Sequence, residues 1–399
     1  MLFVGAGRHQ RRAIAQAKAA KLRVAAVDRN PDAPGLAEAD IAKVVDFADV
    51  DAVLRATSRL KIDGVLTVSA DRAVPVVAAV AAARGLPGIG LETAHLLTNK
   101  IAMRRRLAER GVPQPRFAAV RTISETRRAV DEVGFPAVLK PADSGGQRGV
   151  FRVESLDDVH AHLHEALAAS PTGEAILEEF VEGTELNGML VARGGEVIPL
   201  TLSDRLRPPG IGFGVGWIHV YPPTIPDAQL EEAERVAAHT VHALGLRNAI
   251  AFPQVIAHPD GRVVVVECAA RIPGGQMADL VRWAVGVDLI DVQLRLALGD
   301  ELPDEVVRPR FSRPLSIRFL TAQPGPLPTG KVVHIGPLDK VLAFPGVVQA
   351  DVYLQLGETI RPVRLDGDRR GYVIAVGDTN LQALERAEAA STLLDVEVE

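Results

Sequence analysis

Val138 to Val150 reads Val-Leu-Lys-Pro-Ala-Asp-Ser-Gly-Gly-Gln-Arg-Gly-Val. A short apolar run carries Lys140, and a loop of small residues follows before a β-branched residue restarts a strand, so the stretch predicts strand, loop and strand. Gly145, Gly146 and Gly149 allow backbone N–H groups to turn toward an anion, and Lys140 adds a positive charge beside them. The pattern is typical of a polyphosphate site, although a surface hairpin with an exposed lysine has the same residues.

The composition of the chain narrows the class of protein. Its 399 residues predict two or three domains, and an apolar content of 47% predicts a folded, globular chain. A net charge of −5 offers no basic face, so we expect no nucleic-acid partner. Cys268 is the single cysteine, which excludes an intramolecular disulfide and a zinc cluster and fits a reducing compartment.

Two apolar stretches argue against export and against membrane insertion. Residues 1–5 have no basic region before them and lead into a glycine turn, so they predict a folded strand and not a signal peptide. Residues 74–83 are about half as long as the ~20 residues that a membrane span needs. We therefore expect a cytoplasmic protein without a membrane partner.

The first hundred residues alternate strands with helices, which predicts a parallel sheet covered on both faces. The predicted strands are 2–4, 23–27, 43–46 and 64–68, and the predicted helices are 11–20, 50–59 and 92–110.

Gly5, Gly7 and Asp28 suggest a dinucleotide site, but Gln10 stands where the third glycine of that fingerprint belongs, so NAD binding is the minor alternative. Asp71 either faces a ligand or caps a helix. Lys100 lies on the last of these helices, where a lysine is more often solvated than bound.

A second acidic segment follows at residues 175–185. An apolar strand runs into Glu178 and Glu179, then Phe180 and Val181. A strand that opens into a linker exposes backbone groups able to bind an adenine edge, and a later carboxylate can accept from ribose hydroxyls. The alternative is an acidic strand edge that discourages aggregation.

Residues 250–255 and 263–266 predict two strands joined by an Asp-Gly turn. The second is a run of four valines that ends at Glu267, and Arg271 follows four residues later. A carboxylate there is costly unless it is paired or holds a cation, so Glu267 could bind Mg²⁺ and Arg271 a phosphate or carboxylate. A structural Glu–Arg pair is the alternative.

Taken in order, Lys100, Lys140 with its loop, the acidic hinge with Glu185, and Glu267-x-x-x-Arg271-x-x-Gly-Gly resemble the ATP-grasp superfamily, of the carboxylate–amine ligase type. The resemblance covers essentially the whole chain. It implies mixed α/β and α+β architecture: a Rossmann-like parallel-sheet domain at 1–100, the ATP-grasp fold at 101–302 and a small α+β domain at 303–399.

The resemblance also implies a reaction and its residues. A substrate carboxylate attacks the γ-phosphorus of ATP to give an acyl phosphate, and an amine then displaces phosphate. The implied cofactors are ATP and Mg²⁺ or Mn²⁺. The implied contacts are Lys100, Lys140, Ser144, Gly145, Gly146 and Gln147 with phosphates, Glu178, Glu179, Phe180 and Val181 with adenine, Glu185 with ribose, Glu267 with the metal, and Arg271 with the transferred phosphoryl group.

Two positions depart from the family pattern. Ala269 replaces a common metal-binding asparagine, and Gln254 replaces a common glutamate, although an amide can bind Mg²⁺ through its carbonyl. These changes leave open a module that binds ATP without turnover. A biotin-carboxylase-like enzyme that activates bicarbonate or formate is the other alternative, but the pattern from Glu267 to Gly275 resembles L-amino acid ligases more closely.

The substrate end is less defined. Many glycines surround Arg205 and His219, which predicts a mobile loop over the site. Arg205 could hold a substrate carboxylate and His219 could lie near the amine, with Gly274 and Gly275 beside them.

Residues 303–314 predict a linker. The rest predicts four strands, a closing helix and no chemistry: a packing module in which Arg369 and Arg370 contact the ATP domain, and which could form a homodimer.

Overall fold

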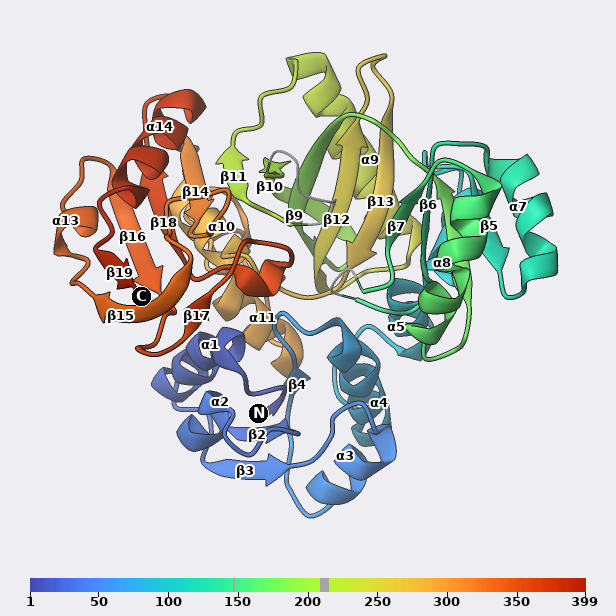
Figure 1. Ribbon diagram of the computed structural model, residues 1–399. Coiled ribbons are helices and arrows are strands. Elements are labelled where there is room, and N and C mark those ends of the chain that lie inside the picture. Colours follow the sequence, from blue (N-terminus) through green and yellow to red (C-terminus); the bar gives the residue numbers. More distant parts are fainter. Residues whose placement is uncertain (146–147, 209–214) are drawn as a thin grey trace.

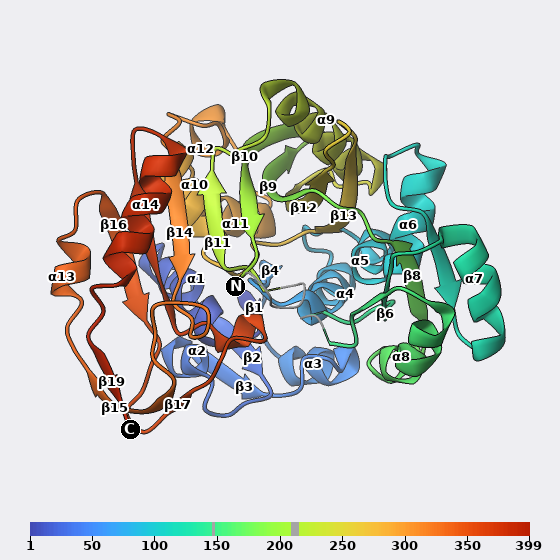
Figure 2. The ribbon, with the colours of Figure 1, turned by 45° about the horizontal axis from the view of Figure 1, so that its top comes forward.

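The computed structural model describes residues 1–145, 148–208 and 215–399. One large sheet is accompanied by three smaller ones: the parallel sheet of the N-terminal part, a small antiparallel sheet and a small C-terminal sheet (Figures 1 and 2). The predicted mixture of α/β and α+β architecture is confirmed. None of the helices within these ranges is long and apolar enough to cross a bilayer.

The N-terminal part is a four-stranded parallel sheet in the order β3-β2-β1-β4. Its elements are β1 (Leu2–Val4), α1 (Arg8–Ala19), β2 (Ala25–Asp28), α2 (Pro34–Glu38), β3 (Ile41–Val44), α3 (Val50–Thr57), β4 (Val65–Leu66), η1 (Asp71–Ala73) and α4 (Val74–Arg84). Asp28 accepts hydrogen bonds from the N–H groups of Ala6 at 2.8 Å and Asn30 at 2.9 Å. Its carboxylate therefore braces the glycine turn itself, which weakens the dinucleotide alternative.

The helix predicted over 92–110 is two helices, α5 (Leu91–Thr98) and α6 (Lys100–Glu109). Asn99 lies between them in an extended conformation, and its side chain accepts a hydrogen bond from the N–H of Ala102 at 2.9 Å. An asparagine favours such an N-cap because it satisfies a free N–H group of the first turn. The break makes Lys100 the first residue of α6.

The small antiparallel sheet has the order β5-β8-β6-β7. Its elements are β5 (Phe117–Val120), η2 (Ile123–Glu125), α7 (Thr126–Val133), β6 (Ala137–Pro141), β7 (Phe151–Val153), α8 (Leu156–Ala168) and β8 (Ala175–Glu179). The two helices pack over the sheet and enclose a separate apolar core. The stretch from Val138 thus forms the predicted strand, loop and strand, with the second strand starting at Phe151.

The large sheet has eight strands in the order β13-β12-β9-β10-β11-β14-β18-β16. Its strands are β9 (Thr184–Arg193), β10 (Glu196–Leu206), β11 (Ile218–Tyr221), β12 (Ala249–Ala257), β13 (Val263–Ala269), β14 (Leu315–Phe319), β16 (Val347–Val352) and β18 (Gly371–Val376). Its helices are α9 (Asp227–Ala243), α10 (Met277–Val285), α11 (Leu289–Leu298) and α14 (Asn380–Ser391). Because β11 pairs with β14, the sheet continues across the boundary predicted at residue 302.

The remaining C-terminal elements form a small sheet in the order β17-β15-β19. They are α12 (Asp304–Val307), β15 (Gly330–Ile335), α13 (Asp339–Leu342), β17 (Thr359–Ile360), η3 (Asp366–Asp368) and β19 (Val396–Val398). The predicted linker at 303–314 therefore contains one helical turn, α12.

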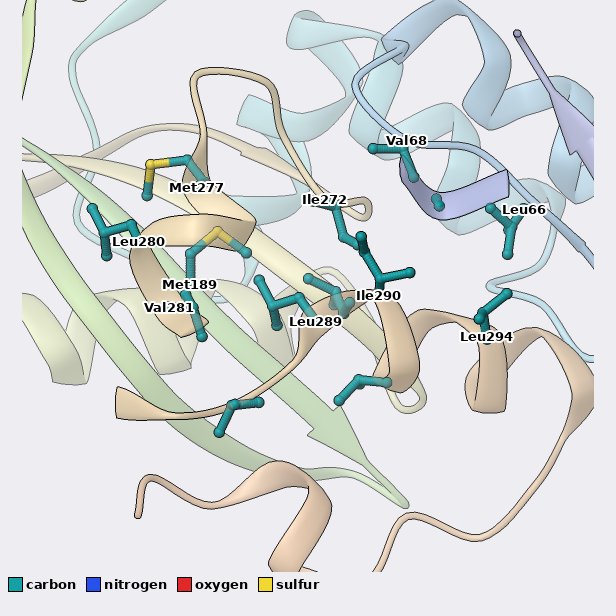
Figure 3. Close-up of a cluster of buried hydrophobic side chains, with 14 of the residues drawn as sticks. Leu66, Val68, Met189, Ile272, Met277, Leu280, Val281, Leu289, Ile290 and Leu294 are labelled. Atoms are coloured by element: carbon teal, nitrogen blue, oxygen red, sulfur yellow. The ribbon is translucent and has the colours of Figure 1, made fainter. Parts of the chain in front are cut away.

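One apolar core joins the N-terminal part to the large sheet. Leu66 and Val68 pack with Met189 of β9 and with the helices α10 and α11 (Figure 3). Leu315 and Ile317 of β14 belong to the same core and have no exposed surface. The parts that surround the site are thus held together by shared burial of apolar surface.

Candidate active site

A cavity of about 530 Å³ lies where these parts meet. The predicted site residues that the structure describes all line it: Lys100, Lys140, Ser144, Gly145, Glu178, Glu179, Phe180, Val181, Glu185, Arg205, His219, Gln254, Glu267, Arg271, Gly274 and Gly275. Gly146 and Gln147 lie outside the described residues. The sequence thus predicted residues that meet at one place, while their chemical roles stay predictions.

Lys140 and Glu178 form the centre of one end of the cavity. Val138 lies opposite Glu178 in the register of β6 and β8, so Lys140, two residues on, is its diagonal neighbour on the same face. The Lys140 Nζ lies 2.7 Å from Glu178 Oε2. Burial lowers the pKa of Lys140, and Glu178 offsets part of this effect. Although burial raises the pKa of Glu178, the charges of Arg104 and Lys140 outweigh burial and bring it to about 2.

The hinge after β8 offers backbone groups to a ligand. The N–H groups of Glu179 and Phe180 donate to the carbonyls of Arg116 at 2.9 Å and Pro136 at 3.1 Å. Val181 lines the cavity, and its N–H has no hydrogen-bond partner among residues 1–145, 148–208 and 215–399. Because Glu178 is engaged by cations, the hinge can bind an adenine edge through its backbone and not through that carboxylate.

Glu185, the predicted ribose contact, is held by two arginines. Its Oε2 lies 2.7 Å from Arg205 Nη1, and its Oε1 lies 2.8 Å from Arg207 Nη2. These ion pairs fix the carboxylate at the cavity wall. A ribose hydroxyl would share the carboxylate oxygens with guanidinium groups.

The predicted metal residues lie side by side on neighbouring strands. Gln254 of β12 pairs in register with Glu267 of β13 and with Asn187 of β9. The Gln254 amide nitrogen donates to Asn187 Oδ1 at 3.0 Å, and the register with Glu267 places these two side chains on the same face of the sheet. No group of three or more His, Cys, Asp or Glu side chains suited to a metal exists in the described part of the chain. One carboxylate and one amide oxygen fit a single Mg²⁺ that takes its other ligands from phosphates and water.

Arg271 joins the metal strand to the N-terminal part. Its Nε donates to Asp71 Oδ1 at 2.7 Å, and its Nη2 forms an ion pair with the same carboxylate. Its Nη1 is buried and has no partner among the residues that the structure describes. Asp71 therefore orients the guanidinium, and one donor stays available to a ligand. The sequence had left Asp71 open between a ligand contact and a helix cap.

The other end of the cavity is lined by buried, positively charged or aromatic side chains. Arg369 stacks over the ring of Phe319 at 4.2 Å, and burial lowers its pKa. His219 is 3% exposed, and burial, with the charges of Arg369 and Arg205, lowers its pKa to about 3. A Cβ atom at Gly275 would lie 3.3 Å from Arg369 Nη1 and 3.4 Å from His219 Nε2. Glycine therefore permits this close approach.

Arg8 and Tyr353 also line the cavity, although no sequence pattern predicted either of them as a site residue. The Arg8 guanidinium lies 3.7 Å from the centre of the Tyr353 ring, a cation–π contact between the first and last parts of the chain. Within the described ranges Arg8 has no carboxylate partner. Tyr353, Asp366 and Arg369 line the cavity, so the expectation that the C-terminal part is only a packing module was wrong. In the sequence, the position of Arg369 beside a predicted buried strand was the local pattern that pointed to this part of the chain.

Comparisons with known proteins agree with this geometry. Residues 99–305, just over half of the chain, match the family model of the carbamoyl-phosphate synthase L chain ATP-binding domain. Residues 318–399 match that of the L-amino acid ligase C-terminal domain 2. The uncharacterized protein y4rH of Sinorhizobium fredii is 31% identical over 85% of this chain and 70% of its own length. The formate-dependent phosphoribosylglycinamide formyltransferase of Ignicoccus hospitalis is 26% identical over 99% of this chain and 95% of its own.

Solved structures share the fold over the full length. The L-amino acid ligase of Bacillus licheniformis superposes with a TM-score of 0.85 at 20% identity, covering 100% of this chain and 98% of that one. The phosphoribosylglycinamide synthetase of Anaerococcus prevotii gives a TM-score of 0.80 at 19% identity, covering 100% and 99%. At these identities the likeness is one of fold.

Proposed function

The chain belongs to the ATP-grasp family of the carbamoyl-phosphate synthase ATP-binding domain, and from this premise we propose that it is an ATP-dependent ligase that joins a carboxylate to an amine. The observation that carries the proposal is the convergence of Lys140, Glu267 and Arg271 on one cavity. Cationic groups and an oxygen donor at one place suit a triphosphate.

The proposed reaction has two steps. A carboxylate oxygen of the first substrate attacks the γ-phosphorus of ATP, and the bond to the β-phosphate oxygen breaks to give an acyl phosphate and ADP. The amine nitrogen of the second substrate then attacks the acyl carbon, the bond between that carbon and the phosphate oxygen breaks, and the departing phosphate takes up the proton that the amine loses. The protein mainly positions the reactants and neutralises charge, which is the principal means of catalysis in phosphoryl transfer.

Each end of the cavity has its own part in this proposal. Lys100 and Lys140 neutralise phosphate oxygens, the backbone of the hinge binds adenine, and Arg271 binds the transferred phosphoryl group through its available donor. Glu267 and the Gln254 carbonyl would hold Mg²⁺, which supplies positive charge to the phosphate oxygens when bound.

The substrates occupy the end that contains Arg369, His219 and Gly275 in this proposal. Guanidinium groups there suit a substrate carboxylate. With a pKa of about 3, His219 is a weak base at neutral pH, so it orients the amine by a hydrogen bond and does not remove its proton. We also propose that two copies of the chain associate through their C-terminal parts.

A phosphate-release assay tests the function. ATP and Mg²⁺ are supplied with pairs of amino acids and small acids, and release that requires both an acid and an amine supports the ligase. Release that requires only bicarbonate would contradict it and favour a carboxylating enzyme. Binding of ATP without release under any condition would favour a module without turnover, the alternative that Ala269 and Gln254 leave open.

Two variants connect the assay to the site. We expect Lys140→Ala and Glu267→Gln to lower phosphate release at least about a hundredfold, because the first removes a positive charge that neutralises phosphate oxygens and the second removes the carboxylate that would hold Mg²⁺. Lys61→Ala, at an exposed position, is the matched control and should keep full activity. Thermal unfolding verifies that each variant is folded. Full activity in a site variant would remove that residue from the mechanism.

A further inference from the structure

Arg104 is an arginine with no exposed surface, although it lies in a run of three arginines on α6. Its Nε and Nη2 lie 2.9 and 3.1 Å from the two carboxylate oxygens of Glu178. The guanidinium therefore binds both oxygens of Glu178, the geometry that suits an arginine–carboxylate pair. Arg104 does not line the cavity, so it acts on a ligand through the residues that it holds, Glu178 among them.

The charges of this buried group do not cancel. Glu178 also receives Lys140 Nζ at 2.7 Å, so two cations share one carboxylate and leave one net positive charge. Lys140 and Glu178 line the cavity, whereas Arg104 lies behind them. Without Arg104, Lys140 and Glu178 would neutralise each other in surroundings where charges interact strongly.

We propose that Arg104 is a positioning residue that keeps the nucleotide end of the cavity positive: by holding Glu178, it leaves the charge of Lys140 available to the phosphates of a nucleoside triphosphate. The inference rests on the proposed function, since it assumes that a triphosphate binds beside Lys140. It adds a residue outside the cavity that sets how strongly the cavity attracts that ligand.

Arg104 also has contacts that suit a structural role, and the test must separate the two roles. Its Nη1 and Nη2 donate to the carbonyls of Val265 at 2.8 Å and Val266 at 2.7 Å, just before Glu267. These bonds tie α6 to β13 as well as to β8. A purely structural role would make every substitution of Arg104 harmful, whatever happened to the charge of the group.

Substitutions of Arg104, alone or combined with a substitution of Glu178, change or keep the net charge of the group that these two residues form with Lys140. Binding of the non-hydrolysable ATP analogue AMPPNP with Mg²⁺ is measured by titration calorimetry for the wild type, Arg104→Met, Arg104→Lys and the double variant Arg104→Met/Glu178→Gln. Arg105→Met is the matched control, because it removes one positive charge from an exposed position on the same helix. Thermal unfolding of each protein reports its stability separately.

We expect Arg104→Met to weaken AMPPNP binding at least about tenfold, because the group loses its net positive charge. Arg104→Lys keeps that charge and should stay within about threefold of the wild type. The double variant again carries one net positive charge, so it should recover most of the lost affinity. Arg105→Met should bind normally.

Three outcomes would overturn the inference while leaving the proposed function intact: normal binding by Arg104→Met, a double variant as weak as Arg104→Met, or binding by a folded Arg104→Lys that is more than about tenfold weaker than that of the wild type. The result for Arg104→Lys tests the inference even if Arg104→Met does not fold. A wild-type protein that does not bind AMPPNP at all would instead overturn the proposed function, and this inference with it.

Discussion

His219 is a buried histidine that stays uncharged at neutral pH, because burial and two nearby arginines lower its pKa from 6.5 to about 3. Between these two values the unfolded chain binds a proton that the folded chain does not. The free energy of unfolding therefore decreases as the pH falls through this window, by roughly 1.4 kcal/mol per pH unit for this one group.

We predict that His219→Gln flattens the dependence of the free energy of unfolding on pH. Urea unfolding at pH 7.5, 6 and 5 measures it for the wild type and the variant. His164→Gln, at an exposed position on α8, is the matched control and should keep the wild-type slope. Equal slopes for the wild type and His219→Gln would show that the histidine is protonated in the folded chain.

Residues with a local signal could be predicted from the sequence, and residues that act across the fold could not. Lys140 and Glu267 each lie at the end of an apolar run, where a charged side chain is costly to bury unless it is paired or binds a ligand, so both could be predicted as site residues. Arg104 shares a helix face with the buried Ile101 and Leu107, so helical periodicity could have separated it from Arg105. Arg8 and Tyr353 meet only in the folded chain, and no local pattern marks that contact.

At the scale of elements, the break at Asn99 has a measurable consequence. We predict that Asn99→Ala lowers the free energy of unfolding by about 1 kcal/mol, because the first turn of α6 loses its cap. Asn99→Ser can still accept the hydrogen bond and should stay closer to the wild type. Urea unfolding measures the difference, and equal losses in the two variants would contradict a capping role.

Element types followed from periodicity, whereas element ends depended on tertiary contacts. Helix α8 begins at Leu156, where its cap, Ser155, precedes a regular amphipathic pattern that can be read in the sequence. The helix predicted over 92–110 has enough helix-forming residues on both sides of Asn99 that composition alone gives no reason for a break. The break became visible only where the Asn99 side chain bonds to α6.

At the scale of the whole molecule, the large sheet includes strands of the C-terminal part, namely β14, β18 and β16. The pairing of β11 with β14 joins residues about a hundred positions apart, and no local pattern predicts such a pairing. The division into three domains at residues 100 and 302 stays a prediction. It places a boundary between two strands that are hydrogen-bonded to each other.

We predict that a chain ending at residue 307 aggregates or loses its cooperative unfolding transition. It would expose the edge of β11 and remove Leu315 and Ile317 from the shared core. A chain ending at residue 392 is the control, since it loses β19, which pairs only with β15 in the described sheet. Size-exclusion chromatography and thermal unfolding compare the two. A monomeric, cooperatively folding chain of 307 residues would refute the prediction.

The contact between Asp71 and Arg271 limits how this protein can be recombined with its relatives. The carboxylate comes from the N-terminal part and the guanidinium from the loop after β13, and the N–H of Ser69 donates to the carbonyl of Ile272 at 2.8 Å beside them. A chimera whose first hundred residues come from a relative without an acid at this position would leave a buried guanidinium without its counter-charge. Shuffling of the N-terminal module, in nature or in the laboratory, therefore has to carry this acidic residue along with it.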